Sequence, residues 1–268
     1  MAADNCNLVP WFIRRPPSTY CSLCLLYFRR SSFVGLALLS AVALACKQSF
    51  RPHVDNSMKV LLVLMQPSYA DVTIRGRAIE SAGQIAASVG AEGFGPYVLK
   101  VSQLLTASLR QDQGDPSLVE MVYTCFSNFA VALKEKLGPI MGSIVETILK
   151  DLGTKDLIQL QFERGMAGEF EEEEQDEDKY KQKVRTRDAI VDKRAAGLQA
   201  LGSLATFCGA HMRQFSLNCI KEALENLDYP SIIVNRAAIT AVTALLLNTY
   251  SNLPVCLSCS LAPKLRSR

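Results

Sequence analysis

The stretch Phe94-Gly95-Pro96-Tyr97-Val98 is one of three copies of a pattern in which a large apolar residue precedes Pro by two positions and a second apolar residue follows it by two. The other copies are Phe50-Arg51-Pro52-His53-Val54 and Leu137-Gly138-Pro139-Ile140-Met141. Successive copies lie about 43 residues apart, within the roughly 40–47 residue period of HEAT and armadillo repeats. Because Pro is tolerated in the first turn of a helix, where its missing N–H has no partner to lose, each copy predicts a helix start.

Amphipathic runs follow each copy, and a second helical run follows each of the first two after a break. Asp71 and Asp115 lie at these breaks, where an aspartate caps the free N–H groups of the next helix. The predicted first helices cover residues 54–65, 98–109 and 140–152, and the predicted second helices cover residues 75–87 and 117–132.

The repeat pattern resumes farther along the chain. Asp192-Lys193-Arg194-Ala195-Ala196 and Asn235-Arg236-Ala237-Ala238 lie about 42 residues apart and each lead into an apolar helical run, with a first helix predicted at 215–227 between them. The fold class predicted from these spacings is all-α, a HEAT-repeat α-solenoid of stacked antiparallel helix pairs.

Residues 33–45 fit this series as the second helix of an earlier repeat. The alternative is a targeting signal, because Arg29 and Arg30 precede the apolar run and Ala43-Leu44-Ala45 resembles a cleavage site. The run is shorter than the roughly 20 residues that span a bilayer. It also begins late for a signal peptide. The repeat spacing therefore favours a buried helix.

One segment between the repeats is strongly acidic and contains no basic residue, although the whole chain carries a formal net charge of +3. Like charges at this density repel each other and bury little apolar surface, so they predict a mobile acidic loop. We interpret the loop as a docking site for a basic partner, and a solvated spacer is the alternative. The candidate partner-binding residues are Glu169, Glu171, Glu172, Glu173, Glu174, Asp176, Glu177 and Asp178.

These observations divide the chain into five segments. We expect an irregular N-terminal segment at 1–30, HEAT repeats at 31–165, the acidic loop within a repeat at 166–183, HEAT repeats at 184–250 and an irregular C-terminal tail at 251–268.

The nine cysteines show no spacing typical of a disulfide scaffold, which favours reduced thiols in the cytoplasm or nucleus. The pairs Cys21/Cys24 and Cys256/Cys259 are too far apart in the sequence for a zinc ribbon. We therefore predict no metal site. The net charge is too small to indicate direct binding of nucleic acid, and we predict none.

Two further patterns are candidates for chemistry. Cys208 and His211 could form a thiolate couple, but no orienting carboxylate or amide accompanies them in a recognisable pattern. The order of Gly90, Gly93 and Gly95 does not match a phosphate loop, and these glycines instead predict a helix stop before Pro96. The sequence thus predicts no catalytic residue, no cofactor and no enzyme activity.

The run Val184-Arg185-Thr186-Arg187-Asp188-Ala189-Ile190-Val191-Asp192-Lys193-Arg194-Ala195-Ala196 follows the acidic block and leads into Leu201-Gly202. This arrangement resembles the importin-β superfamily, the karyopherin nuclear transport receptors, and most closely the branch with the importin-four-like and importin-five-like receptors. In that branch an acidic insertion is followed by a V-R-x-A…D-x-K-x-x-A…L-G helix. The resemblance covers residues 33–250.

The resemblance implies a superhelical receptor that shuttles between cytoplasm and nucleus. Its implied partners are basic cargo proteins, the small GTPase Ran in its GTP form and nucleoporins, with no membrane partner, and the acidic loop would contact Ran or cargo. The chain departs from the family pattern at residues 1–30 and after Asn252, and the family's main Ran-binding repeats lie near the amino terminus of much longer chains. A general HEAT scaffold unrelated to Ran and a membrane-anchored protein using residues 33–45 are the alternatives.

Overall fold

The computed structural model describes residues 32–69, 71–111, 115–156, 158–159 and 177–250, and every regular element within these ranges is helical. The fold is all-α and HEAT-like, as the repeat spacing predicts. The chain divides into two compact units, Met1–Gln111 and Asp112–Arg268, which are described separately. The irregular segments expected at 1–30 and 251–268 lie outside the described residues.

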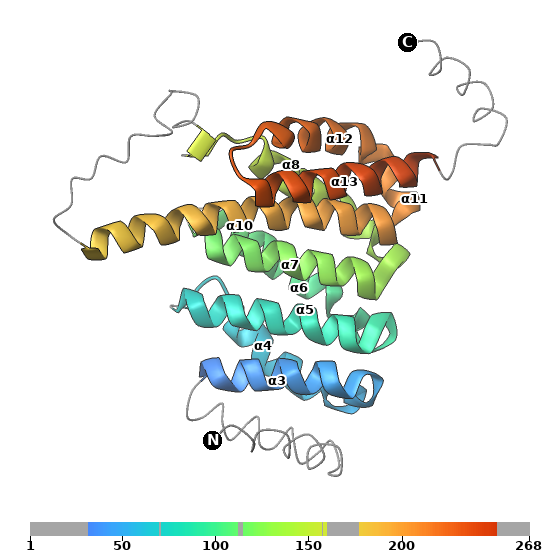
Figure 1. The fold of residues 1–268 in the computed structure, drawn as a ribbon. Helices are drawn as coiled ribbons and strands as arrows, with labels where there is room; N and C mark the ends of the chain where they lie inside the picture. The colour runs from blue at the N-terminus through green and yellow to red at the C-terminus, as the bar shows by residue number, and fades with distance from the viewer. Residues whose placement is uncertain (1–31, 70, 112–114, 157, 160–176, 251–268) are drawn as a thin grey trace, which may run out of the picture. The chain divides into compact units, whose positions relative to one another are not determined.

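The first unit contains α3 (Ser32–Cys46), α4 (Val54–Leu64), α5 (Val72–Phe94) and α6 (Val98–Gln111). Helix α5 packs against α3 on one side and also contacts its own repeat partner α4 (Figure 1). Asp71 caps α5 by accepting a hydrogen bond from the backbone of Ile74 at 3.1 Å, as its position before the helix predicts.

The second unit contains α7 (Pro116–Leu133), α8 (Gly138–Leu152), α10 (Glu177–Phe207), α11 (Gly209–Met212), α12 (Ser216–Glu225) and α13 (Ile232–Tyr250). Helix α10 lies between α7 and α13, and α12 contacts both α13 and α8 (Figure 1). Two layers result, with α7, α10 and α13 in one layer and α8 and α12 in the other.

The apolar residue that opens each copy of the proline pattern is fully buried, as Phe50, Phe94 and Leu137 show. Each lies in or beside a short 3₁₀ turn that leads into a first helix. A fourth, degenerate copy has Gln214 where the others have proline and Ser216 where they have the second apolar residue, so the proline pattern alone does not identify it. There Met212 is fully buried, and a 3₁₀ turn (Arg213–Phe215) again leads into a first helix, α12.

Neighbouring repeats bind each other through side chains at equivalent positions. The hydroxyl of Ser40 donates to that of Ser81 at 2.8 Å, and the hydroxyl of Tyr97 donates to Asp55 at 2.5 Å; the sequence separations are 41 and 42 residues. The Ser40–Ser81 and Asp55–Tyr97 separations are close to the repeat period, because each bond joins one repeat to the next. In the second unit Lys193 on α10 donates to Asp151 on α8 at 2.9 Å and so joins the two helices of one repeat.

Helix α10 is longer than the sequence analysis predicts. It begins at Glu177, so the expected acidic-loop boundary at residue 183 is wrong, because residues 177–183 are helical. This segment is Glu-Asp-Lys-Tyr-Lys-Gln-Lys, in which Glu, Lys and Gln favour helices and the charges are of mixed sign. Residues 160–176, which hold most of the acidic block, lie outside the described part of the chain.

Within the part of the chain that the structure describes, three helical stretches are long and apolar enough to cross a membrane by length and composition alone, namely Phe33–Leu64, Pro116–Leu152 and Ile232–Thr249. The first two are each interrupted by a 3₁₀ turn. Between 33% and 50% of the most apolar window of each stretch is buried within the fold.

The hydrogen bond between Tyr97 and Asp55 predicts a pH-dependent link between α4 and the 3₁₀ turn (Gly95–Tyr97) that leads into α6. The pKa of Tyr97 is raised from 10.0 to about 12, and this bond to the carboxylate is the largest cause, with burial the second. A raised phenol pKa means that the stabilisation is complete below pH 10 and is lost as the pH rises through 12. We expect Tyr97→Phe to lower the thermal midpoint at pH 8 and to have little effect near pH 12. Tyr69→Phe serves as the control, and an unchanged difference between wild type and Tyr97→Phe across this range would contradict the assignment.

Candidate functional site

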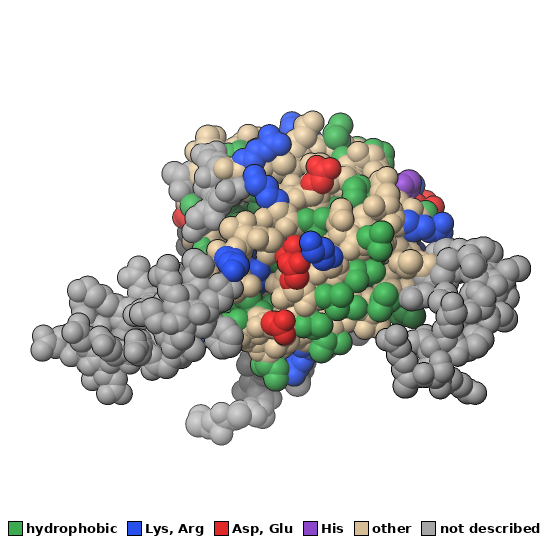
Figure 2. All heavy atoms as spheres, turned by 90° about the horizontal axis from the view of Figure 1, so that it is seen from above, with side chains coloured by type: hydrophobic (Ala, Val, Ile, Leu, Met, Phe, Trp, Pro, Cys, Tyr) green, Lys and Arg blue, Asp and Glu red, His purple; other side chains and the backbone are tan. Residues whose placement is uncertain are grey.

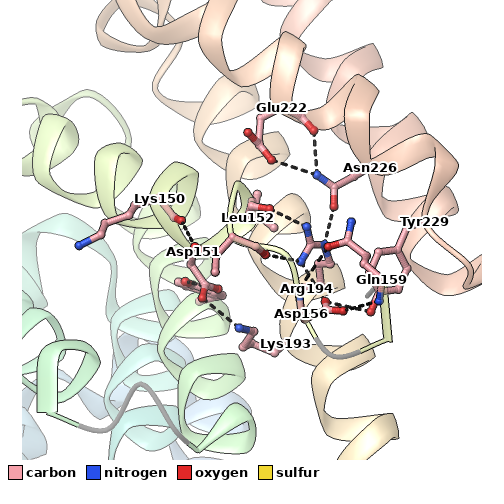
Figure 3. A network of polar contacts seen from close by, with 12 residues as sticks. Lys150, Asp151, Leu152, Asp156, Gln159, Lys193, Arg194, Glu222, Asn226 and Tyr229 are labelled. Carbon is pink, nitrogen blue, oxygen red and sulfur yellow. Dashed lines mark hydrogen bonds and ion pairs between the residues drawn. The ribbon is translucent and has the colours of Figure 1, made fainter. Parts of the chain in front are cut away.

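The acidic block lies between α8 and α10, and a cluster of buried polar side chains joins these two helices to the following repeat. We call Asp156, Arg194, Asn226 and Tyr229 the Arg194 cluster (Figure 3). Arg194 belongs to α10, Asp156 follows α8, and the other two residues follow α12. The side chain of Arg194 is only 3% exposed, so its charge must be paired and its N–H groups bonded within the protein.

Several groups accept hydrogen bonds from the Arg194 guanidinium. Its Nη1 donates to Asp156 Oδ2 at 2.9 Å, and its Nε donates to Asn226 Oδ1 at 2.6 Å. Its Nη2 donates to the backbone carbonyl of Leu152 at 2.5 Å, at the last residue of α8. The ring of Tyr229 lies 5.0 Å from the guanidinium carbon and adds a cation–π contact. One side chain thus joins α10 to the end of α8 and to the turn after α12.

The partners of Arg194 are themselves held in place. Tyr229 donates its hydroxyl to Asp156 Oδ2 at 3.0 Å, and Asn226 donates its amide to the Glu222 carbonyl at 2.8 Å. Burial is the main cause of the raised pKa of Tyr229, and the charge of Asp156 adds to it. The phenol therefore stays protonated at neutral pH and can donate its hydrogen bond. Burial, with a smaller contribution from Glu225, also raises the pKa of Glu222.

A second group of contacts lies beside the Arg194 cluster and joins α7, α8 and α10. Asp151 accepts from Lys193 Nζ at 2.9 Å and from the hydroxyl of Tyr123 at 2.9 Å. Burial is the main cause of the raised pKa of Tyr123, and Asp151 adds to it. Because Lys193 and Arg194 are adjacent on α10, this helix is fixed against two different acidic side chains at the end of α8.

The role of Arg194 has equivalents in other repeats. On α5, the buried Arg75 donates from Nη1 to the carbonyls of Pro67 at 2.6 Å and Tyr69 at 3.3 Å. On α13, the side-chain amide of Asn235 donates to the carbonyl of Tyr229 at 2.8 Å and to that of Ser231 at 3.0 Å. In these three repeats a polar side chain on the second helix therefore binds the segment that precedes it.

The chain after α8 remains anchored as far as Gln159, the last described residue before the acidic block. Ile158 is buried, and Asp156 and Gln159 exchange two backbone-to-side-chain bonds of 3.3 and 3.0 Å. The candidate residues Glu169, Glu171, Glu172, Glu173, Glu174 and Asp176 lie outside the described residues. Glu177 and Asp178 open α10, but their side chains are not described. The docking role of these eight residues therefore stays a prediction.

The Cys208–His211 pair has properties unlike those of a reactive thiolate. Cys208 is buried and donates to the carbonyl of Lys134 at 3.2 Å, whereas His211 is exposed. Burial, with a smaller contribution from Glu135, raises the pKa of the Cys208 thiol to about 11. The thiol is protonated at neutral pH, which weakens it as a nucleophile.

The other cysteine and glycine candidates are less informative. Gly90 adopts φ +68° within α5 and marks a kink there, in agreement with the expected helix stop. The cysteines of the two C-x-x-C pairs lie outside the described residues.

The Arg194 cluster predicts a large loss of stability when its cation is removed. Arg194→Met leaves the Asp156 carboxylate without its cation and the Leu152 carbonyl without its side-chain donor, so we expect the free energy of unfolding to fall by about 3–5 kcal/mol. The exposed Arg213→Met is the matched control and is expected to change it by less than about 0.5 kcal/mol. Urea unfolding followed by circular dichroism measures both, and losses of similar size in the two variants would refute a structural role for the cluster.

Comparison with known proteins relates this geometry to a family. No family model matches the chain. A curated relative, the probable importin subunit beta-4 of Schizosaccharomyces pombe, is 23% identical over 186 residues, which is 65% of this chain and 17% of the relative. The chain thus spans about a sixth of the length of that relative.

Solved structures with the same fold are karyopherins. Kap121p bound to Ste12p matches with a TM-score of 0.66 and 20% identity, over 87% of this chain and 23% of Kap121p. Kap121p bound to the extreme C-terminus of Cdc14p gives 0.64 and 18%, again over 87% of this chain and 23% of the other. Kap95p in complex with RanGDP gives 0.60 and 17%, over 87% of this chain and 26% of Kap95p. At these identities the structural matches establish the fold.

The sequence relative and the shared fold both agree with the resemblance carried by the acidic block and the helix after it. The chain is similar to the importin-β superfamily of karyopherin nuclear transport receptors, over a segment that corresponds to about a quarter or less of each of these relatives.

Proposed function

We propose that this chain is a protein-binding part of a nuclear import receptor, and that its acidic block docks basic segments of cargo and Ran in its GTP form. The observation that carries the proposal is the position of the block. Six acidic residues of the block lie in the connection between α8 and α10 and two more open α10, and the Arg194 cluster holds the start of that connection and the middle of α10 to the helix stack.

The physical basis is electrostatic steering. A dense cluster of one charge sign attracts an oppositely charged partner over distance and accelerates its encounter, and salt weakens the effect. A rigid base is needed for such a cluster to act at a defined place on the receptor. The buried Arg194 and the partly buried Lys193 supply this base, because each is paired with an acidic residue at the end of α8 or just beyond it.

The solved relatives support partners of this kind. Kap121p is bound to Ste12p in one structure and to the extreme C-terminus of Cdc14p in another, and Kap95p is in complex with Ran. Because this chain spans only part of each relative, binding of cargo, Ran-GTP and nucleoporins by this chain is a proposal, as is its shuttling between cytoplasm and nucleus. A general HEAT scaffold is the competing function, and it predicts partners that are insensitive to the nucleotide on Ran.

Charge neutralisation of the acidic block tests the proposal. The variant carries Gln at Glu171, Glu172, Glu173 and Glu174 and Asn at Asp176, which keeps the length and polarity of the segment. We expect its affinity for a fluorescent lysine-rich nuclear-signal peptide to fall roughly tenfold or more, mainly through slower association, and the remaining affinity to depend less on salt. Fluorescence anisotropy measures the affinity, and stopped-flow mixing measures the rate.

The matched control neutralises exposed acidic residues elsewhere in the second unit, namely Glu135, Glu146 and Glu225. Parallel pull-downs with GTP-loaded and GDP-loaded Ran separate the two candidate functions. Peptide binding that is equal in wild type, variant and control would reject the acidic docking site. Capture of Ran that does not depend on its nucleotide would favour the general scaffold.

A further inference from the structure

Helix α10 extends beyond the layer that it forms with α7 and α13. Helices α5 and α13 begin three residues before Arg75 and Asn235, the side chains that bind the preceding segment. Helix α10 begins 17 residues before the equivalent Arg194. The added length projects past the ends of α7 and α13 (Figure 1). Among the described helices, none of the same layer lies beside this extension.

The described part of the extension is exposed on every side. Arg185, Thr186, Arg187 and Asp188 are all exposed, and the first buried residue in the described part of α10 is Arg194. Successive residues of a helix are turned by about 100°, so four in a row cover its whole circumference. The helix at this point can therefore be contacted by a partner from any side.

The extension is also strongly basic. From Lys179 to Arg187 every second residue is Lys or Arg, and no acidic residue lies among them. We call Lys179, Lys181, Lys183, Arg185 and Arg187 the basic arm. Members four residues apart are neighbours on a helix and repel each other, so the arm does not neutralise its own charge. Figure 2 shows several Lys and Arg side chains on the side of the fold toward which α10 extends in Figure 1.

The basic arm changes what the acidic block attracts. Residues 169–187 together hold eight acidic and five basic residues, a net charge of −3. The helix rises by about 15 Å from Glu177 to Arg187. Salt screens exposed charges beyond about 8 Å at physiological ionic strength, so a bound partner meets two regions of opposite sign. A purely basic partner is attracted by the block but repelled where it approaches the arm.

We propose that the basic arm binds an acidic segment of the same partner whose basic segment docks on the acidic block. This inference rests on the proposed function, because the block must hold the basic segment. Opposite charges then pair in both regions, whereas like charges oppose a partner that is basic throughout, which gives the site specificity. The rise of the arm corresponds to about five extended residues between the two segments of the partner.

Two other anionic partners fit the arm less well. Double-stranded DNA carries one charge per roughly 1.7 Å of its length, so it would bring negative charge against the acidic block as well as the arm. Helices that lie on an anionic membrane bury an apolar face, but Tyr180 and Val184 are the only apolar residues between Lys179 and Arg187. A protein segment of mixed charge matches the sequence better than either.

Two fluorescent peptides and the full chain test the proposal by fluorescence anisotropy. One is the lysine-rich peptide, and the other joins the same sequence to a glutamate-rich segment through five Gly and Ser residues. The variant carries Gln at Lys181, Lys183 and Arg185, which keeps the helix propensity. It retains Arg187, whose charge opposes the rise in the pKa of Tyr229. We expect the variant to bind the two-part peptide roughly tenfold more weakly and the lysine-rich peptide equally or more tightly.

The matched control carries Gln at the exposed Lys136, Lys150 and Arg213 and is expected to bind both peptides as wild type does. Circular dichroism confirms that both proteins are folded. Equal losses in variant and control would overturn the proposal. So would tighter binding of both peptides by the variant, which would assign the arm to the acidic block of its own chain. A single-stranded oligonucleotide that loses affinity while the two-part peptide does not would assign the arm to nucleic acid instead. The proposed function fails separately, when neutralising the acidic block leaves binding of the lysine-rich peptide unchanged.

Discussion

The buried guanidinium of Arg194 is the constraint on which the second unit depends. A charge at 3% exposure is tolerated only when its partners are fixed in advance, and here they come from the end of α8, the segment after it and the turn after α12. All three must be folded before the charge is satisfied. The cluster therefore couples the repeat that contains the acidic block to the repeat after it, and gives a stack of short helices a cooperative polar core.

The same requirement recurs along the chain with different side chains. Arg75 and Asn235 bind the turns before their helices as Arg194 does, and α7 relies on its Asp115 cap, which accepts from the backbone of Ser117 and Leu118. The turn between paired helices leaves backbone carbonyls without helical partners, and a donor from the second helix satisfies them. Repeats can thus diverge in sequence while keeping one geometry, because an arginine or an asparagine can each donate to this turn, whereas the Asp115 cap accepts from the free N–H groups at the start of α7.

The helix pairs could be predicted from the sequence because their signals are local. Pro96 and Asp71 mark helix starts through their own backbone chemistry, and apolar spacing indicates the buried face. The Arg194 cluster was not predictable in this way, since Asp156 and Tyr229 are separated by 73 residues and only the fold brings them together. The sequence marked Arg194 as part of a recurring Arg-Ala-Ala pattern, but the exposed Arg236 shares that pattern, and only packing distinguishes the two. The helical start of α10 was missed because a high density of acidic residues was taken to exclude helix up to residue 183.

The proposed docking role of the acidic block rests on attraction that acts before contact. Attraction between the block and a basic segment acts at long range and weakens as salt shortens the Debye length to about 8 Å near physiological ionic strength. Contacts between uncharged side chains act only when water is excluded, and added salt weakens them little. The salt dependence of an association therefore distinguishes binding through the acidic block from binding through an apolar surface.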